Sequence, residues 1–178
     1  SYSFKNPGSG TTSGSYWNAT VVVYADGFMA DGIIFENSFN QYISEKEAND
    51  IVGLESGNKG VRPTTVGDTS VQYRDFVERA GALSIASGTH IFFNNCKFIG
   101  RQDTLYGQEG SVVGFNKCDI LGAVDYIYGG MTAVFSDCNL MMNTSEKSSD
   151  AAYLTAAQQA GGRGFLFWNC NVTSTTPG

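Results

Sequence analysis

Phe92-Phe93-Asn94-Asn95-Cys96-Lys97-Phe98 is one copy of the repeat that decides the fold of this 178-residue chain. The phenylalanine three residues before the cysteine, and the apolar residue two after it, recur around Cys118, Cys138 and Cys170. The cysteine spacings are 22, 20 and 32. Periods of roughly this size, built from short β-rich runs, indicate coils of strands that stack and bury their inner faces on one another. We therefore expect an all-β fold, a parallel β-helix with one coil per repeat.

A weaker copy of the repeat precedes these four. In the segment from Ile33 to Ser38, serine stands where the other copies have cysteine, so we align Phe35 with the repeated phenylalanine. The apolar pattern is lost between about residues 40 and 78, and we interpret this polar segment as an insertion on one side of the solenoid. The one stretch with helical character lies inside it, at residues 44–50.

Composition favours one folded domain over residues 1–178. The chain is 42% apolar and 13% aromatic, which is enough for a core, and its 22 glycines with 3 prolines fit many short strands joined by turns. Only 16% of the residues are charged and the net charge is −6, which argues against a nucleic-acid partner. No apolar run approaches the length of a membrane span, so we expect no membrane partner.

The four cysteines have an interpretation of their own. They occupy the same position in each copy of the repeat, so we expect a stacked ladder of buried free thiols rather than disulfides. No second type of metal ligand accompanies them, and we therefore expect neither a metal nor another cofactor.

Two aspartates occupy equivalent places in successive copies. Asp103 is seven residues after Cys96, and Asp125 is seven residues after Cys118. Equivalent positions of adjacent coils lie about 4.8 Å apart, the normal spacing of neighbouring strands. Two carboxyl groups so close do not both ionise easily, and the fold would thereby create an acid–base pair.

The segments around these aspartates resemble a known family. Gly100-Arg101-Gln102-Asp103-Thr104-Leu105-Tyr106 and Gly122-Ala123-Val124-Asp125-Tyr126-Ile127-Tyr128-Gly129 resemble the two signature motifs of pectin methylesterases, and the resemblance extends over about residues 20–172. It implies a right-handed parallel β-helix and a secreted carboxylic ester hydrolase. The substrate and partner would be pectin, through the methyl esters of homogalacturonan. The chain shows no secretion signal at its start, so we expect the signal to lie outside it.

The resemblance also implies a role for each residue of the motifs. Asp125 would be the nucleophile, and Asp103 would be the general acid and then the general base. The side-chain amide of Gln102 would donate a hydrogen bond to the oxyanion. Tyr126 and Tyr128 replace family phenylalanines and would bind the sugar.

Two departures from the family pattern concern arginine. Arg79 stands where the family has a second oxyanion glutamine, and we retain it as a candidate substrate-binding residue. The G-R-P-W segment, which supplies the arginine that holds the family's nucleophile, does not occur in this sequence. We expect the chain to be a fragment truncated at both ends, with weak or no activity by itself. Other modules of a longer chain are further candidate partners.

Alternative functions remain open at this point. One is a polysaccharide-binding β-helix without catalysis, and another is a β-helix polygalacturonase or lyase. A Ser-His-Asp hydrolase is disfavoured, because His90 is the sole histidine and the sequence lacks a G-x-S-x-G elbow.

Overall fold

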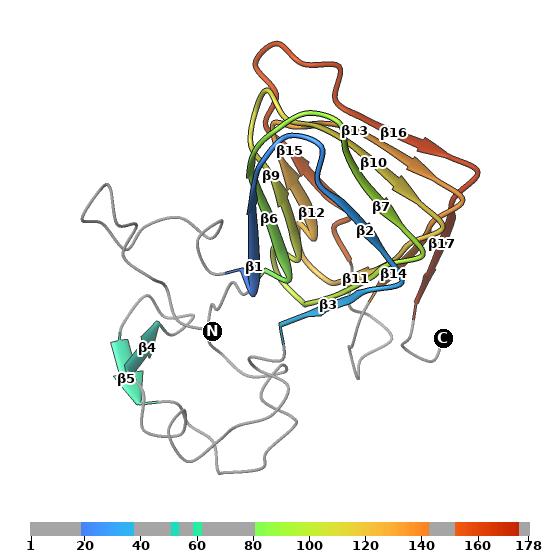
Figure 1. The fold of residues 1–178 in the computed structure, drawn as a ribbon. Coiled ribbons are helices and arrows are strands. Elements are labelled where there is room, and N and C mark those ends of the chain that lie inside the picture. The colour runs from blue at the N-terminus through green and yellow to red at the C-terminus, as the bar shows by residue number, and fades with distance from the viewer. Residues whose placement is uncertain (1–18, 38–50, 54–58, 62–80, 143–151, 175–178) are drawn as a thin grey trace.

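The computed structural model describes residues 19–37, 51–53, 59–61, 81–142 and 152–174. Three five-stranded sheets wind around a common axis, and every neighbouring pair of strands within them is parallel (Figure 1). Sheet A comprises β1 (Val21–Tyr24), β6 (Leu83–Ser87), β9 (Leu105–Gly107), β12 (Ile127–Gly129) and β15 (Thr155–Ala157). Sheet B comprises β2 (Met29–Asp31), β7 (Ile91–Asn94), β10 (Val112–Asn116), β13 (Thr132–Ser136) and β16 (Phe165–Trp168). Sheet C comprises β3 (Ile34–Glu36), β8 (Lys97–Ile99), β11 (Asp119–Gly122), β14 (Asn139–Met142) and β17 (Asn171–Ser174).

Each coil contributes one strand to sheet A, then one to sheet B and one to sheet C. This arrangement is a parallel β-helix, as the repeat predicts. The cysteine spacings are also the coil lengths, because Phe93 pairs with Phe115, Phe115 with Phe135, and Phe135 with Phe167.

The repeated phenylalanines form the central column of the core. The ring centroids of Phe93 and Phe115 are 5.1 Å apart, those of Phe115 and Phe135 are 4.7 Å apart, and those of Phe135 and Phe167 are 4.8 Å apart. All three pairs are stacked. Each such pair contributes about 0.5–1.5 kcal/mol beyond the burial of its area, which favours the in-register stacking of coils.

A tight turn between sheets B and C explains the residue before each cysteine. Asn95, Lys117, Asp137 and Asn169 all have positive φ, between 51° and 54°. Asparagine and aspartate tolerate this left-handed conformation better than most residues, and three of the four positions carry them. Each turn directs the next side chain, the cysteine, into the core.

The cysteines are free thiols, as predicted. Cys118 Sγ donates to the carbonyl oxygens of Asn116 at 3.3 Å and Phe93 at 3.6 Å, and the other three make corresponding contacts. A hydrogen bond with the Cys138 thiol, together with burial, raises the pKa of Cys118 above its usual range. The thiols of Cys96, Cys118 and Cys138 are buried, whereas Cys170 is half-buried.

The predicted alignment of the first coil is wrong. Phe35 pairs with Phe98 in sheet C and stacks on its ring at 5.2 Å, whereas the sequence pattern aligned it with Phe93 in sheet B. Ala30 is the residue that pairs with Phe93. Because the first coil has no cysteine, nothing in its sequence marks this displacement of the motif.

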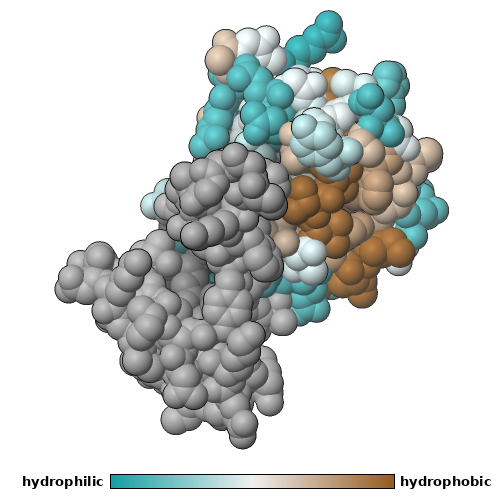
Figure 2. All heavy atoms as spheres, turned by 60° about the vertical axis from the view of Figure 1, so that its left-hand side comes forward, coloured by the Kyte–Doolittle hydropathy of each residue, from teal (hydrophilic) through white to brown (hydrophobic). Residues whose placement is uncertain are grey.

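The expected insertion separates this first coil from the second. Within it the structure describes an antiparallel pair of strands, β4 (Ile51–Gly53) and β5 (Lys59–Val61), which the sequence pattern did not indicate. The expected helical stretch at 44–50 lies outside the described residues. None of the described residues forms a helix long and apolar enough to cross a membrane. Figure 2 shows that hydrophobic and hydrophilic side chains gather on different parts of one face of the described β-helix.

Candidate active site

Two equivalent segments connect sheet C to sheet A in successive coils, residues 100–104 and residues 123–126. Gln102 pairs with Val124 in an isolated parallel bridge, and Leu105 pairs with Ile127 where the strands of sheet A begin. Both pairs have the same offset along the chain, so Asp103 and Asp125, which lie between them, occupy equivalent positions of neighbouring coils. The register predicted for the two aspartates is therefore confirmed.

Backbone hydrogen bonds hold the two segments together on either side of the aspartates. The N–H of Asp103 donates to the carbonyl oxygen of Val124 at 3.0 Å, and the N–H of Leu105 donates to that of Tyr126 at 2.8 Å. The N–H of Ala123 donates back to the carbonyl oxygen of Arg101 at 2.8 Å. The ladder thus continues through the connection, which fixes the separation of the two aspartates at about one strand spacing.

Both aspartates adopt the same uncommon backbone conformation. The φ angle is 60° at Asp103 and 48° at Asp125, in the left-handed region that aspartate tolerates better than most residues. Similar φ angles at equivalent positions start the two side chains from matching points of neighbouring coils. The turns before the cysteines share this conformation, so it marks a sharp turn of the backbone at each aspartate.

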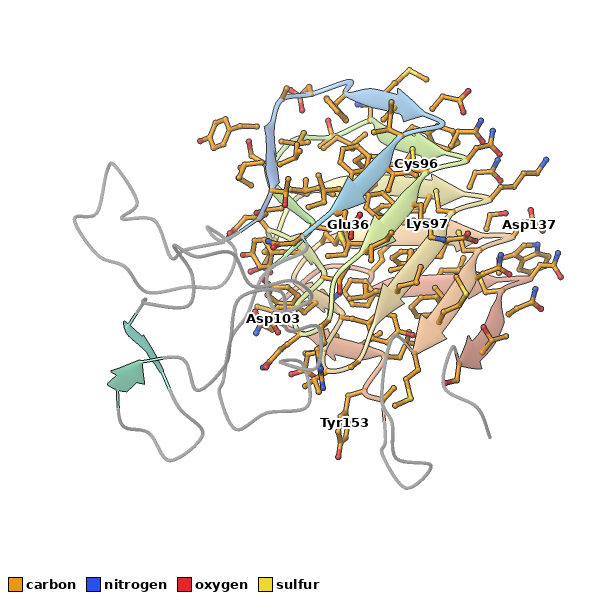
Figure 3. All side chains as sticks on the ribbon, turned by 90° about the horizontal axis from the view of Figure 1, so that it is seen from below. Glu36, Cys96, Lys97, Asp103, Asp137 and Tyr153 are labelled. Atoms are coloured by element: carbon orange, nitrogen blue, oxygen red, sulfur yellow. The ribbon has the colours of Figure 1, made fainter. Side chains whose placement is uncertain are left out.

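The two carboxyl groups differ in their contact with water. Asp103 is 5% exposed, whereas Asp125 is only half-buried. In Figure 3, Asp103 lies at the corner of the coil opposite to Asp137, which marks the turn between sheets B and C. The aspartates therefore occupy a corner of their own, remote from the cysteine turns.

The glycine that opens each motif makes room for the residue four positions later. A Cβ on Gly100 would lie 2.6 Å from Oγ1 of Thr104, and a Cβ on Gly122 would lie 2.0 Å from Cβ of Tyr126. Thr104 Oγ1 also donates to the carbonyl oxygen of Leu121 at 3.0 Å, which ties one connecting segment to the neighbouring coil. The bend that presents each aspartate therefore depends on the absence of a side chain at the glycine.

The other predicted site residues have different surroundings. Gln102 is half-buried and directly precedes Asp103, in the bridge described above. Arg79 lies outside the described residues. Tyr128 is on the outer side of sheet A but is only 6% exposed, and its ring centroid lies 4.9 Å from that of Tyr106, which is buried as well. The hydroxyl of Tyr106 donates to Oε1 of Gln108 at 2.7 Å.

Tyr126 occupies the hydrophobic core rather than a surface that sugar could reach. It is 1% exposed and packs among the core residues, and burial raises its pKa to about 12. The left-handed backbone at Asp125 interrupts the alternation of inward and outward side chains. The residue after the aspartate consequently points into the core, which argues against a direct substrate contact.

Tyr153 is a site candidate that the sequence analysis did not single out. Ile127 pairs with Thr155, so the position equivalent to Asp125 in the next coil is Tyr153, whose N–H donates to the carbonyl oxygen of Ala123 at 2.8 Å. Its side chain is 60% exposed and points away from the sheets in Figure 3. Tyr153 thus lies beside Asp125 in the next coil, but without the left-handed backbone of the two aspartates. More residues separate Tyr153 from Asp125 than separate Asp125 from Asp103, so the regular spacing of the motifs did not reveal Tyr153.

Metal-dependent arrangements have no counterpart in the part of the chain that the structure describes, where no group of three or more histidine, cysteine, aspartate or glutamate side chains could hold an ion.

The family model of pectinesterases matches residues 74–177, which include both aspartate motifs. The chain belongs to the pectinesterase family. Pectinesterases with known structures include the pectin methylesterase PemA from Erwinia chrysanthemi, which is 26% identical, with a TM-score of 0.66 over 92% of this chain and 43% of that protein. The pectin methylesterase from Yersinia enterocolitica is 29% identical, with a TM-score of 0.66 over 90% of this chain and 45% of that one.

A plant pectinesterase shares the fold at lower identity. The pectin methylesterase from carrot is 22% identical, with a TM-score of 0.61 over 92% of this chain and 40% of its own. The chain spans less than half the length of these solved pectin methylesterases. A comparison with curated proteins gave no match.

Proposed function

We propose that the protein hydrolyses the methyl esters of galacturonate units in pectin, releasing methanol and a free carboxylate, and that it acts outside the cell. The observation that carries this proposal is the placement of Asp103 and Asp125 at equivalent positions of neighbouring coils, both with left-handed backbone. Membership of the pectinesterase family, and the pectin methylesterases among similar structures, support the substrate class.

Asp125 is the proposed nucleophile because it is the more accessible of the two carboxylates. Its oxygen would attack the carbonyl carbon of the ester and form a tetrahedral intermediate with a negative oxygen. The adjacent amide of Gln102 on the neighbouring coil is the proposed donor to this oxyanion. Loss of one such donor typically lowers the rate roughly 10²–10³-fold.

Asp103 is the proposed acid and base. Burial disfavours the charged form of a carboxyl group, and Asp103 is 5% exposed, so it suits the role of the protonated partner. It would give its proton to the departing methoxide, which leaves as methanol, while Asp125 becomes an acyl anhydride. A water molecule would then give a proton to Asp103 and attack the anhydride, which frees the galacturonate and restores Asp125.

Substrate contacts are assigned from exposure. Tyr153 is the proposed platform for a sugar ring, because it is exposed and follows Asp125 along the axis. Tyr128 stays a candidate because it lies on the outer side of sheet A, although it is only 6% exposed. Arg79, outside the described residues, stays a candidate as well. Tyr126 packs in the core and is left out of the proposed contacts.

The test uses the longest natural protein that carries this chain, with pectin as substrate and methanol as product. Asp125→Asn and Asp103→Asn should each lower methanol release by at least about 10³-fold, the scale at which removal of a catalytic group acts. Glu109→Gln is the matched control, because Glu109 is exposed in the connection between sheets A and B and its replacement keeps an acceptor for the N–H of Ala160. It should leave the rate unchanged.

Near-normal methanol release by either aspartate variant would refute the assignment. Release of new reducing ends from polygalacturonate would instead favour a glycosidase. Inverting glycosidases need about 6.5–9.5 Å between their carboxyl groups, which is wider than one strand spacing of about 4.8 Å.

A further inference from the structure

The outer face of sheet B carries a continuous row of apolar side chains. Backbone pairing aligns Met29, Phe92, Gly114, Val134 and Leu166 across all five strands. We call these five residues the outer stripe. Its four side chains are 72%, 38%, 42% and 53% exposed in that order, so the row lies open to solvent. Four strand spacings give the row a length of roughly 19 Å.

Gly114 makes the stripe flat. A Cβ at this position would lie 2.8 Å from Cδ2 and 3.1 Å from Cε2 of Phe92, so the phenyl ring extends over the backbone of the neighbouring strand. A ring that lies along a sheet, with its side chain still 38% exposed, offers a face to a ligand. Such a platform suits the C–H face of a sugar ring, which stacks on aromatic surfaces.

A polar row borders the stripe two residues further along each strand. It contains Asp31, Asn94, Asn116, Ser136 and, on the last strand, Trp168. Asn116 Nδ2 donates to Asn94 Oδ1 at 2.7 Å, and Asn94 Nδ2 donates to Asp31 Oδ1 at 3.2 Å. Trp168 is 66% exposed. A hydrogen-bonding side chain thus stands beside the stripe in the first four coils and an aromatic ring in the fifth, and a polysaccharide likewise offers both hydroxyls and ring faces.

The charge of the protein favours a neutral polysaccharide over an anionic one. The five residues of the outer stripe are uncharged, and the whole chain has a net charge of −6. A de-esterified galacturonan is a polyanion that such a protein repels, whereas a methyl-esterified stretch is neutral and more apolar. The stripe is also on a different sheet from the corner between sheets C and A that holds the two aspartates.

We propose that the outer stripe binds methyl-esterified stretches of homogalacturonan as a second, non-catalytic site that keeps the protein on ester-rich pectin. This inference rests on the proposed function for its choice of polymer. The strand spacing of about 4.8 Å is close to the length of one sugar unit, so successive coils would present successive units with the same contacts.

The experiment compares retention in gels that contain highly esterified pectin with retention in gels that contain polygalacturonate. The stripe variant is Phe92→Ser/Leu166→Ser, and Leu166→Asn alone is a milder second variant. Ile34→Ser/Val172→Ser is the matched control, because these exposed residues lie on sheet C. Methanol release from a short esterified oligogalacturonate, too short to reach both sites, is measured for each protein.

The stripe variant should bind esterified pectin about tenfold more weakly than the wild type, the scale of one lost aromatic contact, while the control pair binds normally. Methanol release from the oligomer should be unchanged. If the wild type releases no methanol, but the stripe variant is still retained less than the wild type, the second site stands and the proposed function is rejected. Unchanged retention of the stripe variant would overturn the inference, as would equal retention on both polymers. The wild type could also form concentration-dependent dimers that the stripe variant does not form. If retention on pectin is then unchanged, the stripe serves self-association, and the inference is overturned.

Discussion

The backbone N–H of Asp103 donates to the carbonyl oxygen of Val124 at 3.0 Å, directly before Asp125 in the next coil. This bond belongs to the ladder that continues through the connection between sheets C and A. The ladder and the shared left-handed backbone place the two aspartates at equivalent positions one strand spacing apart. The proposed acid–base pair is thus a property of coil register, and changes that disturb the register should disturb the chemistry.

Gly122→Ala tests the bend that presents Asp125. The new Cβ would lie 2.0 Å from Cβ of Tyr126 and 2.8 Å from Oγ1 of Thr104, both fully buried. Overpacking of this kind typically costs about 1–3 kcal/mol, so urea unfolding should show a loss of that size. Gly161→Ala, where the added Cβ would meet no atom within 4 Å, is the control and should leave the unfolding midpoint unchanged. Equal midpoints for the two variants would contradict the packing account.

Tyr153→Ala should raise KM for pectin several-fold and change kcat less, because the lost ring would contact sugar rather than the reacting ester. Tyr153→Phe keeps the ring and should behave nearly as the wild type if stacking is the contact. Steady-state methanol release over a range of pectin concentrations separates the two parameters. A fall in kcat with an unchanged KM would instead place Tyr153 among the groups that act on the ester.

Asp26 joins the first coil to the second, and its contribution to the free energy of unfolding should depend on pH. Its Oδ1 accepts hydrogen bonds from the N–H of Thr89 at 2.7 Å and from its hydroxyl at 3.2 Å, and these bonds, the backbone one first, lower the pKa of Asp26 below its ordinary value of 3.8. A lowered folded-state pKa contributes stability above the unfolded-state pKa, which is lost as the pH falls through the folded-state pKa. The difference in unfolding free energy between the wild type and Asp26→Ala should therefore be full at neutral pH and shrink below about pH 4.

The matched control for this effect is Glu36→Gln, an exposed carboxylate on the same coil. Urea unfolding at a series of pH values gives both comparisons. A stability difference for Asp26→Ala that stays constant from neutral pH down to pH 3 would show that the carboxylate charge contributes nothing there.

The thiols should react in an order set by burial. Cys96, Cys118 and Cys138 are buried, whereas Cys170 is only half-buried, although burial raises the pKa of Cys170 as well. An aromatic disulfide reagent under native conditions should therefore label Cys170 first, with the other three labelled only as the protein unfolds. Mass spectrometry of the labelled peptides gives the order. Labelling of Cys118 as fast as Cys170 would contradict the ladder of buried thiols.

The four cysteine coils could be predicted because their phenylalanine, cysteine and apolar residue recur at fixed distances. The same regularity predicted the register of Asp103 and Asp125. The first coil was misaligned, since Phe35 has the right residue type but pairs with Phe98. A motif without its cysteine does not reveal which of two adjacent sheets its phenylalanine joins.

The site residues show a similar limit. The family motif predicts an aromatic residue after the nucleophile but not its direction, and the left-handed φ of 48° at Asp125 turns Tyr126 into the core. Tyr153 was missed because it lies further along the chain from Asp125 than Asp125 lies from Asp103, so the regular spacing of the two motifs does not extend to it. Both outcomes depend on the path of the backbone through a connection, and residue types at these positions do not determine it.

A double-mutant cycle on methanol release tests the central claim most directly. If Asp103 and Asp125 act as one pair, Asp103→Asn/Asp125→Asn should be no slower than the slower single variant, because either substitution already removes the shared chemistry. The measured coupling should then be nearly as large as the effect of one substitution. Losses that add on a logarithmic scale would show two independent residues and contradict the pair.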